Sequence, residues 1–175
     1  MIRSLACLLV LFLSGCSSLP ASHDNTWLWQ LSGRAVFQGP DQRESANILW
    51  QSAARRDSVQ LSGPFGQGAV RLIADSTGAS LWRDGEIQAS DIDIESLLTQ
   101  HLHWQVPIKE LRAWVRGDNA PGDIHVLEES AQRRRFEQAG WVIEQSKLDP
   151  EGRPHKVVIA RPPYKLTLLI AQWNS

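Results

Sequence analysis

The clearest chemistry in the sequence belongs to Cys16, which follows the most hydrophobic segment of the chain. Arg3 provides a short positive region, and residues 5–13 (LACLLVLFL) are almost all aliphatic. This run is too short to span a bilayer as a helix, which needs roughly 20 residues, and it is typical of a secretory signal. Cys7 lies inside the segment that would be removed, so the mature chain keeps one thiol. A lone thiol in an exported protein is unusual unless it is modified.

The residues around this cysteine indicate which modification it receives. Leu13-Ser14-Gly15-Cys16 resembles the bacterial lipobox. The resemblance implies cleavage before Cys16, a diacylglyceryl group on its sulfur and an acyl group on the new amine. One acyl chain holds a protein only marginally, whereas two or more anchor it stably. We therefore expect residues 1–15 to be a lipoprotein signal peptide and residues 16–26 a lipidated N-terminus and polar tether. The alternative is a membrane anchor with an incidental cysteine.

Residue 17 bears on the membrane to which such a lipoprotein is sorted. Asp after the modified cysteine tends to retain similar lipoproteins at the inner membrane, and this chain has Ser17 instead. In a cell with two membranes, this favours a lipid-anchored protein of the outer membrane.

The remaining polar residues form no pattern typical of a catalytic or metal site. His101-x-His103 could place two metal ligands on one strand face, but no third His or Cys lies nearby in the sequence. Serines are plentiful, yet none stands in a G-x-S-x-G context. The adjacent carboxylates Glu128 and Glu129 are typical of a turn. We therefore expect a protein that is not an enzyme, with no catalytic residues, no metal and no cofactor; a lipid-anchored hydrolase is the weakest alternative.

Charge and composition argue against a nucleic-acid-binding protein. The net charge is −1, and residues 133–135 (RRR) are the one basic run, whereas nucleic-acid binding needs a concentrated basic face. This run is typical of a solvated strand face, with contact to phospholipid headgroups as the alternative. The chain has eight tryptophans, which suit cores, interfaces and membrane surfaces. We expect most of them in the core or in a cavity wall.

Alternation of apolar and polar residues predicts an antiparallel sheet along most of the chain. The alternating segments are residues 29–37, 46–50, 59–61, 70–74, 79–81, 124–126, 134–136, 141–143, 157–159 and 166–173. Tight turns such as Asp84-Gly85 and residues 149–152 (DPEG) join them and imply an antiparallel meander. A sheet of about ten strands curls into a barrel or near-barrel. We expect one domain over residues 27–175, and alternation does not decide whether its interior is solid or hollow.

The middle of the chain changes to a helical period. The apolar residues at helical spacing are Ile94, Leu97, Leu98 and Leu102, followed by Ile108, Leu111, Trp114 and Val115. Ser90 is expected to cap the first helix, with Asp91 and Asp93 in its first turn. Pro107 is expected to begin the second helix and Gly117 to end it. Two short helices must bury their apolar faces, and the open concave face of the curled sheet is the natural place.

An aromatic residue lies at the tip of a glycine-rich turn, residues 63–68 (GPFGQG). Turn tips usually carry polar residues, and a glycine-rich frame gives Phe65 little to pack against. The aromatic ring therefore either folds back into the core or stands in solvent. We interpret Pro64, Phe65 and Gly66 as a candidate membrane-insertion loop, with the groove of another protein as an alternative target. A phosphate-binding loop is excluded because no G-x-x-x-x-G-K-[ST] motif is present.

These features together resemble the LolB family of outer-membrane lipoprotein receptors. The matching segments are the lipobox, Gly33-Arg34-Ala35, Leu49-Trp50-Gln51, Leu61-x-Gly63-Pro64-Phe65-Gly66, Pro107-Ile108-x-x-Leu111-x-x-Trp114-Val115-x-Gly117 and Leu166-x-Leu168-x-Ile170-x-x-Trp173. They extend over nearly the whole mature chain. The resemblance implies a mainly β (α+β) fold, a half-open antiparallel β-barrel with short helices forming a lid over an apolar cavity.

The resemblance also implies a function. Such proteins accept lipoproteins from the periplasmic carrier LolA, hold their acyl chains in a hydrophobic cavity and insert them into the outer membrane. The implied partners are LolA, acylated lipoprotein cargo and outer-membrane phospholipid, and the implied form is a lipid-anchored monomer facing the periplasm. Phe65 matches a loop position that is commonly Leu in the family. The alternative is a structural outer-membrane lipoprotein of an assembly complex, with a solid core.

The inner-face residues of the expected sheet and helices supply the candidate lining of the acyl-chain cavity. They are Trp29, Leu31, Ile48, Trp50, Leu61, Leu72, Leu97, Leu111, Trp114, Leu168 and Ile170. From the residues alone, each of them could equally be plain core.

Overall fold

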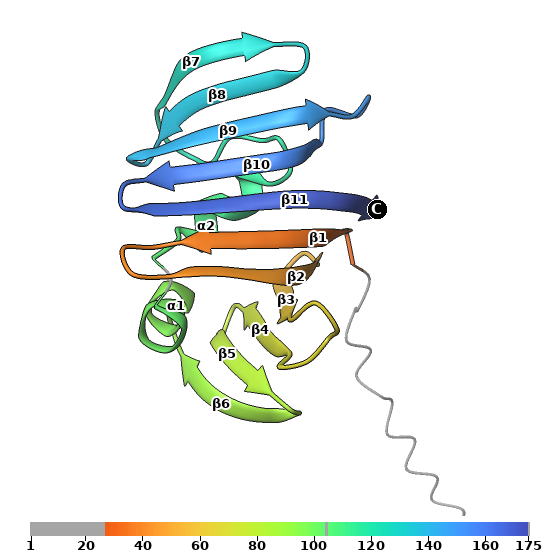
Figure 1. The fold of residues 1–175 in the computed structure, drawn as a ribbon, viewed down its shortest axis with the longest axis vertical. Coiled ribbons are helices and arrows are strands. Elements are labelled where there is room, and N and C mark those ends of the chain that lie inside the picture. Colours follow the sequence, from red (N-terminus) through yellow and green to blue (C-terminus); the bar gives the residue numbers. More distant parts are fainter. Residues whose placement is uncertain (1–26, 104, 175) are drawn as a thin grey trace, which may run out of the picture.

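The computed structural model describes residues 27–103 and 105–174, so Cys16, the expected signal peptide and the tether lie outside the described residues (Figure 1). The described chain contains eleven strands and two helices. The strands are β1 (Trp29–Gln38), β2 (Arg43–Ser52), β3 (Arg56–Ser62), β4 (Val70–Asp75), β5 (Gly78–Arg83), β6 (Glu86–Asp91), β7 (Ile124–Ser130), β8 (Arg133–Gln138), β9 (Trp141–Leu148), β10 (Pro154–Arg161) and β11 (Tyr164–Asn174). The helices, α1 (Ile94–Leu102) and α2 (Ile108–Trp114), lie between β6 and β7.

All strands belong to one antiparallel sheet that does not close. Its order is β6-β5-β4-β3-β2-β1-β11-β10-β9-β8-β7, so the first and last strands of the chain pair at its centre. The end strands β6 and β7 do not pair with each other, which leaves the barrel half open. The predicted half-open antiparallel barrel with short helices is therefore confirmed.

A bulge helps the two central strands to bend. The β1–β11 register shifts between Ser32 and Gly33, and such bulges increase local bending and twist. A side chain at Gly33 would overlap the carbonyl oxygen of Leu169. Glycine is therefore required here by the close approach of the neighbouring strand.

The start of the first helix differs from the sequence prediction. Ser90 pairs with Ser80 in the β5–β6 ladder instead of capping a helix. Asp93 is the N-cap, with extended backbone, and its carboxylate accepts a hydrogen bond from the Ser96 N–H at 3.1 Å. The reason is the Asp84-Gly85 turn, where both residues have positive φ, because it returns the chain as a strand that runs to the end of β6.

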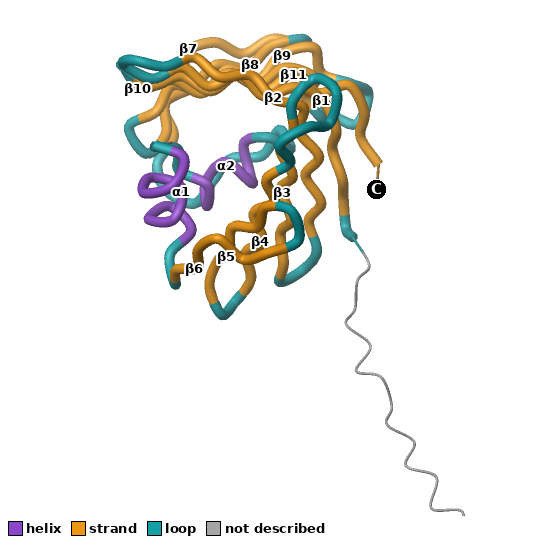
Figure 2. The backbone as a smooth tube through the Cα atoms, turned by 60° about the horizontal axis from the view of Figure 1, so that its bottom comes forward, coloured by secondary structure: helices purple, strands orange, loops and turns teal. Residues whose placement is uncertain are grey.

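Both helices lie in the hollow of the bent sheet (Figure 2). In the described part of the chain, no helix is long and apolar enough to cross a membrane. Helix α2 ends at Trp114, earlier than expected. Gly117, with φ of 91°, belongs to the turn that follows it.

Two separate groups of buried side chains hold the helices. The larger core lies on β1, β2 and β8–β11 and includes Leu111 and Trp114 of α2. The smaller core joins β4 and β5 to Leu97 and Leu98 of α1. The buried residues of the two helices therefore pack against different halves of the sheet, with Ile108 in contact with both.

Candidate functional site

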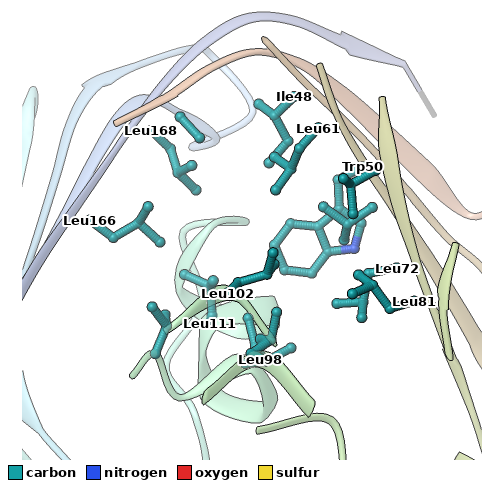
Figure 3. Close-up of a pocket in the computed structure, with 15 residues that line it drawn as sticks. Ile48, Trp50, Leu61, Leu72, Leu81, Leu98, Leu102, Leu111, Leu166 and Leu168 are labelled. Atoms are coloured by element: carbon teal, nitrogen blue, oxygen red, sulfur yellow. The ribbon is translucent and has the colours of Figure 1, made fainter. Parts of the chain in front are cut away.

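An apolar cavity lies between the two cores, with strands on one side and both helices on the other (Figure 3). In Figure 3 the helical residues Leu98, Leu102 and Leu111 face Ile48 and Leu61 across the cavity. The lining consists of Ala35, Ile48, Trp50, Val59, Leu61, Val70, Leu72, Leu81, Leu98, Leu102, Val106, Ile108, Leu111, Leu166 and Leu168. Because every lining side chain is apolar apart from one indole N–H, the site is suited to hydrocarbon.

The structure brings together six of the eleven candidate cavity residues, namely Ile48, Trp50, Leu61, Leu72, Leu111 and Leu168. The other five do not line this cavity. Leu31, Trp114 and Ile170 are buried in the larger core, and Leu97 in the smaller one. Trp29 packs in an aromatic group, with its ring centroid 5.4 Å from that of Trp50.

Nine lining residues were absent from the sequence candidates: Ala35, Val59, Val70, Leu81, Leu98, Leu102, Val106, Ile108 and Leu166. Most of them stand two residues from a candidate on the same strand face, or on the apolar side of a predicted helix. Alternation therefore finds the inner face of the sheet, but it does not separate the part that surrounds a void from the part that is packed.

The cavity is small in this conformation. Its volume is about 40 Å³, enough for only a few water molecules at ~10–15 Å³ each, and far below the roughly 300–1,000 Å³ of ligand pockets. The cavity is therefore closed to an acyl chain in this structure, and its walls would have to move apart to admit one.

Two larger openings share walls with the cavity. The first, here called the Asp93 opening, has a volume of about 530 Å³. It is lined by Trp50, Arg55, Asp57, Val59, Leu72, Ala74, Asp75, Ser76, Gly78, Ile92, Asp93, Ile94, Ile108, Lys109 and Arg112. The second, here called the His103 opening, has a volume of about 350 Å³. It is lined by Ala35, Glu44, Ser45, Ala46, Leu61, Val70, Arg83, His101, Leu102 and His103.

Polar contacts cross the Asp93 opening. The indole N–H of Trp50 donates to Asp57 Oδ1 at 3.1 Å, and Arg112 of α2 forms an ion pair with Asp57 at 3.5 Å. Arg112 also donates to the carbonyl oxygen of Ala53 at 2.8 Å. Lys109 of α2 pairs with Asp93 at 3.1 Å. These contacts connect α2 to the sheet and to the beginning of α1.

Phe65 stands in solvent on a hydrogen-bonded turn between β3 and β4. Its exposed fraction is 95%. Its N–H donates to the side-chain oxygen of Gln67 at 3.0 Å, and the N–H of Gly63 donates to the carbonyl oxygen of Gln67 at 2.9 Å. At the base of the turn, Leu61 pairs with Val70 across the two strands. Both of these residues line the His103 opening, so the Phe65 loop is continuous with the wall of that opening.

Comparison with known protein sequences identifies the family. Residues 28–173 match the family model described as "Outer membrane lipoprotein LolB". The chain belongs to the LolB family. It is 30% identical to the outer-membrane lipoprotein LolB of Marinomonas sp., over 93% of this chain and 92% of the relative. It is 31% identical to LolB of Chromohalobacter salexigens, over 97% and 89%, and 30% identical to LolB of Pseudomonas aeruginosa, over 93% and 90%.

In this LolB-family chain, buried glutamines fix α2 to the sheet. Gln138 of β8 accepts hydrogen bonds from the Trp114 indole N–H at 2.8 Å and from the Ala120 N–H at 2.9 Å. Gln145 of β9 donates to the carbonyl oxygen of Trp114 at 2.8 Å. Sequence reasoning missed both glutamines, although each stands at an inward-facing position of its strand. Since unpaired buried amides are costly, these contacts define the position of α2 closely.

The basic run on β8 of the LolB-family fold is largely paired. Arg133 contacts Glu128 at 3.3 Å and Glu144 at 2.9 Å, and Arg134 contacts Glu129 at 3.2 Å. These neighbours lie on β7 and β9. The pairing favours the interpretation of the run as a solvated strand face.

The Lys109–Asp93 pair gives a pH-dependent prediction. The hydrogen bond from Lys109, followed by that from the Ser96 N–H, lowers the pKa of Asp93 below its ordinary value. A carboxylate whose pKa is lowered by folding stabilises the fold above its unfolded pKa, and the contribution is lost as pH falls through the folded pKa. Lys109→Gln should therefore raise the pKa of Asp93 towards its ordinary value, as measured by carboxyl NMR titration. Lys165→Gln on β11 is the control, and an unchanged Asp93 pKa in Lys109→Gln would refute the pairing.

Proposed function

We propose that this LolB-family protein receives acylated lipoproteins from the soluble carrier LolA, shelters their acyl chains in its interior and inserts them into the outer membrane. The observation that carries this proposal is the wholly apolar cavity between a bent sheet and two helices that belong to different cores. The proposal includes lipidation at Cys16, a signal peptide over residues 1–15, a tether over residues 16–26 and one lipoprotein-binding domain over residues 27–175. The protein would act as a monomer, anchored in the outer membrane and facing the periplasm.

The physical basis is the cost of exposing acyl chains to water. Each methylene is worth ~0.8 kcal/mol when it leaves water for an apolar environment. A chain of about 15 methylenes therefore gains on the order of 10 kcal/mol on burial. Transfer from carrier to receptor to bilayer needs no nucleotide and no covalent chemistry if each site binds the chains more favourably than the one before it. The protein would accordingly not be an enzyme.

Opening of the cavity would separate the two cores. Helix α2 is fixed to the large core by Gln138 and Gln145, whereas α1 packs on β4 and β5. The entering acyl chains would replace the apolar contacts that α1 loses, so the open form is stabilised by its ligand. A ligand that binds only the open form shifts the population towards that form.

The alternative of a structural lipoprotein with a solid core is favoured by one observation, the small volume of the closed cavity. A titration separates the two functions. The mature chain, residues 16–175 with Cys16→Ala, is mixed with dansyl-labelled undecanoic acid, and dansyl fluorescence is followed. Saturable binding that palmitate reverses is the expected result. Fluorescence that rises without saturation, or not at all, would support the solid core.

A further inference from the structure

We propose that acyl chains enter and leave through the His103 opening, beside the Phe65 loop, and that they do not pass through the Asp93 opening. This inference rests on the proposed function and specifies the route by which the ligand reaches the cavity. It also specifies the part of the lid that moves, which is the C-terminal end of α1.

The wall of the cavity continues into the His103 opening without an interposed polar residue. Ala35 of β1, Leu61 of β3, Val70 of β4 and Leu102 of α1 line both spaces. A methylene chain that passes this boundary stays in contact with hydrocarbon along the way. Because burial of apolar surface is favourable, this boundary presents no desolvation barrier to an acyl chain. The boundary with the Asp93 opening is also apolar, so the two routes differ in the outer part of each opening and in what holds the lid there.

The Asp93 opening is bordered by charge. Its lining includes six charged side chains, Arg55, Asp57, Asp75, Asp93, Lys109 and Arg112, whereas that of the His103 opening includes Glu44 and Arg83 together with two histidines. An acyl chain that crosses a charged border displaces water from ionised groups, and such desolvation is unfavourable. The charged border therefore disfavours passage at the Asp93 end.

The two ends of α1 are also held differently. At its beginning, Asp93 caps the helix and pairs with Lys109 of α2, and the neighbouring Asp57–Arg112 pair is reinforced by hydrogen bonds to both partners. Exposed ion pairs alone contribute little, but the Asp57 network is partly buried and connects three segments. At the other end, within the described residues, no hydrogen bond or ion pair joins His101, Leu102 or His103 to the sheet. Leu102 itself packs against the smaller core, and acyl chains can replace such apolar packing.

The covalent link of the cargo supports a single route. The acyl chains of a lipoprotein remain attached to its polypeptide, so the chains cannot enter at one end of the cavity and leave at the other without drawing the polypeptide through. Entry and exit therefore take place at the same opening. The His103 opening is the one whose wall carries Phe65, so chains released there arrive where Phe65 would contact the membrane.

Two alanines allow a matched test. Ala46 of β2 lines only the His103 opening and Ala74 of β4 only the Asp93 opening, and both are half-buried on the inner face of the sheet. Tryptophan at either position fills the opening. Neither alanine lines the cavity, but Ala74 packs against the smaller core, so the dissociation constant of each variant is measured to show that the cavity is preserved. Obstruction of a route slows entry and exit by the same factor and leaves the dissociation constant unchanged, whereas damage to the cavity weakens binding.

Stopped-flow association of dansyl-labelled undecanoic acid, and its displacement by palmitate, are measured on the mature chain with Cys16→Ala. Ala46→Trp should lower both rate constants about tenfold or more with little change in Kd, and Ala74→Trp should leave both rates within about twofold of the parent. Ala46→Leu should give an intermediate effect, which covers the case in which Ala46→Trp does not fold. Slowing by Ala74→Trp alone, equal slowing by both variants, or no slowing by any of them would overturn the inference. Absence of saturable binding in the parent protein would instead overturn the proposed function.

Discussion

Phe65→Glu is expected to abolish delivery of lipoproteins to membranes while acyl-chain binding and the fold stay intact. The side chain is 95% exposed and contributes nothing to either core, so its replacement leaves the stability of the fold unchanged. In the bilayer, Phe65 would gain ~2 kcal/mol from burial of its ring. Loss of that gain, together with the cost of moving a carboxylate out of water, predicts a fall in the insertion rate of about 30-fold or more. The measurement is the transfer of a fluorescent triacylated lipopeptide from the loaded protein to phospholipid vesicles.

Ile92→Glu is the matched control for this experiment. Ile92 is 90% exposed, between β6 and α1. It lies at the Asp93 opening, so it offers an equally exposed apolar side chain away from the Phe65 loop. Delivery should proceed normally in Ile92→Glu. Normal delivery by Phe65→Glu, or equal loss in both variants, would show that the loop has no special role in insertion.

Trp114→Ala is expected to cause the largest loss of stability among single substitutions in the helices. The indole is fully buried in the large core, and its N–H donates to Gln138. Truncation of a buried Trp costs ~3–5 kcal/mol through lost contacts and the resulting cavity. It also removes one partner of Gln138, although Ala120 remains bonded to that amide. The free energy of unfolding, from urea denaturation of the mature chain, should fall by an amount in this range, and the melting temperature should fall with it.

The loss of stability in Leu102→Ala tests whether Leu102 is packed in a solid core or lines the cavity. Leu102 is half-buried, lines the cavity and the His103 opening, and belongs to the less firmly held end of α1. Its truncation should cost less than half as much stability as Trp114→Ala and should accelerate probe entry. If Leu102→Ala proved as destabilising as Trp114→Ala, the end of α1 would be part of a solid core, and the mobile lid would be excluded.

The sequence predicts the sheet because alternation of apolar and polar residues is a direct consequence of strand geometry. The hairpin at Asp84-Gly85 follows from turn chemistry in the same way. The pairing of β1 with β11 brings together the two ends of the sheet-forming chain and follows from no turn. The prediction of Ser90 as the N-cap of α1 was wrong. Ser90 and Asp93 are both good N-cap residues, and the choice between them depends on how far β6 continues to pair with β5. Local preference cannot decide a boundary that is set by a neighbouring strand.

The boundary between core and cavity could not be predicted for a related reason. Leu111 and Trp114 share the apolar side of α2, yet Leu111 faces the void and Trp114 is packed against β8. The helical spacing of apolar residues predicts the side of the helix on which a side chain lies. It does not predict how far that side chain is from the surface it faces. The buried glutamines were missed because their partners lie far away in the sequence, 18 to 31 residues along the chain.

The small cavity is compatible with the proposed function because the interior is divided into two cores. A solid interior would pack α1 and α2 into one continuous group of side chains. Instead, the buried residues of the two helices belong to different groups, with Ile108 in contact with both, and the void lies at the boundary between them. In the proposed function, opening of this boundary would cost apolar contacts at α1, and acyl chains would restore contacts of the same kind.

The most direct test of the central claim is transfer of a triacylated lipoprotein from a soluble LolA complex to the mature chain with Cys16→Ala. After mixing, size-exclusion chromatography separates the two proteins, and the cargo is followed by its label. We predict that the cargo moves to this protein in a one-to-one complex and is then released to added vesicles. If the cargo stays with LolA although the receptor is folded and in excess, the interior does not accept acyl chains and the account is contradicted.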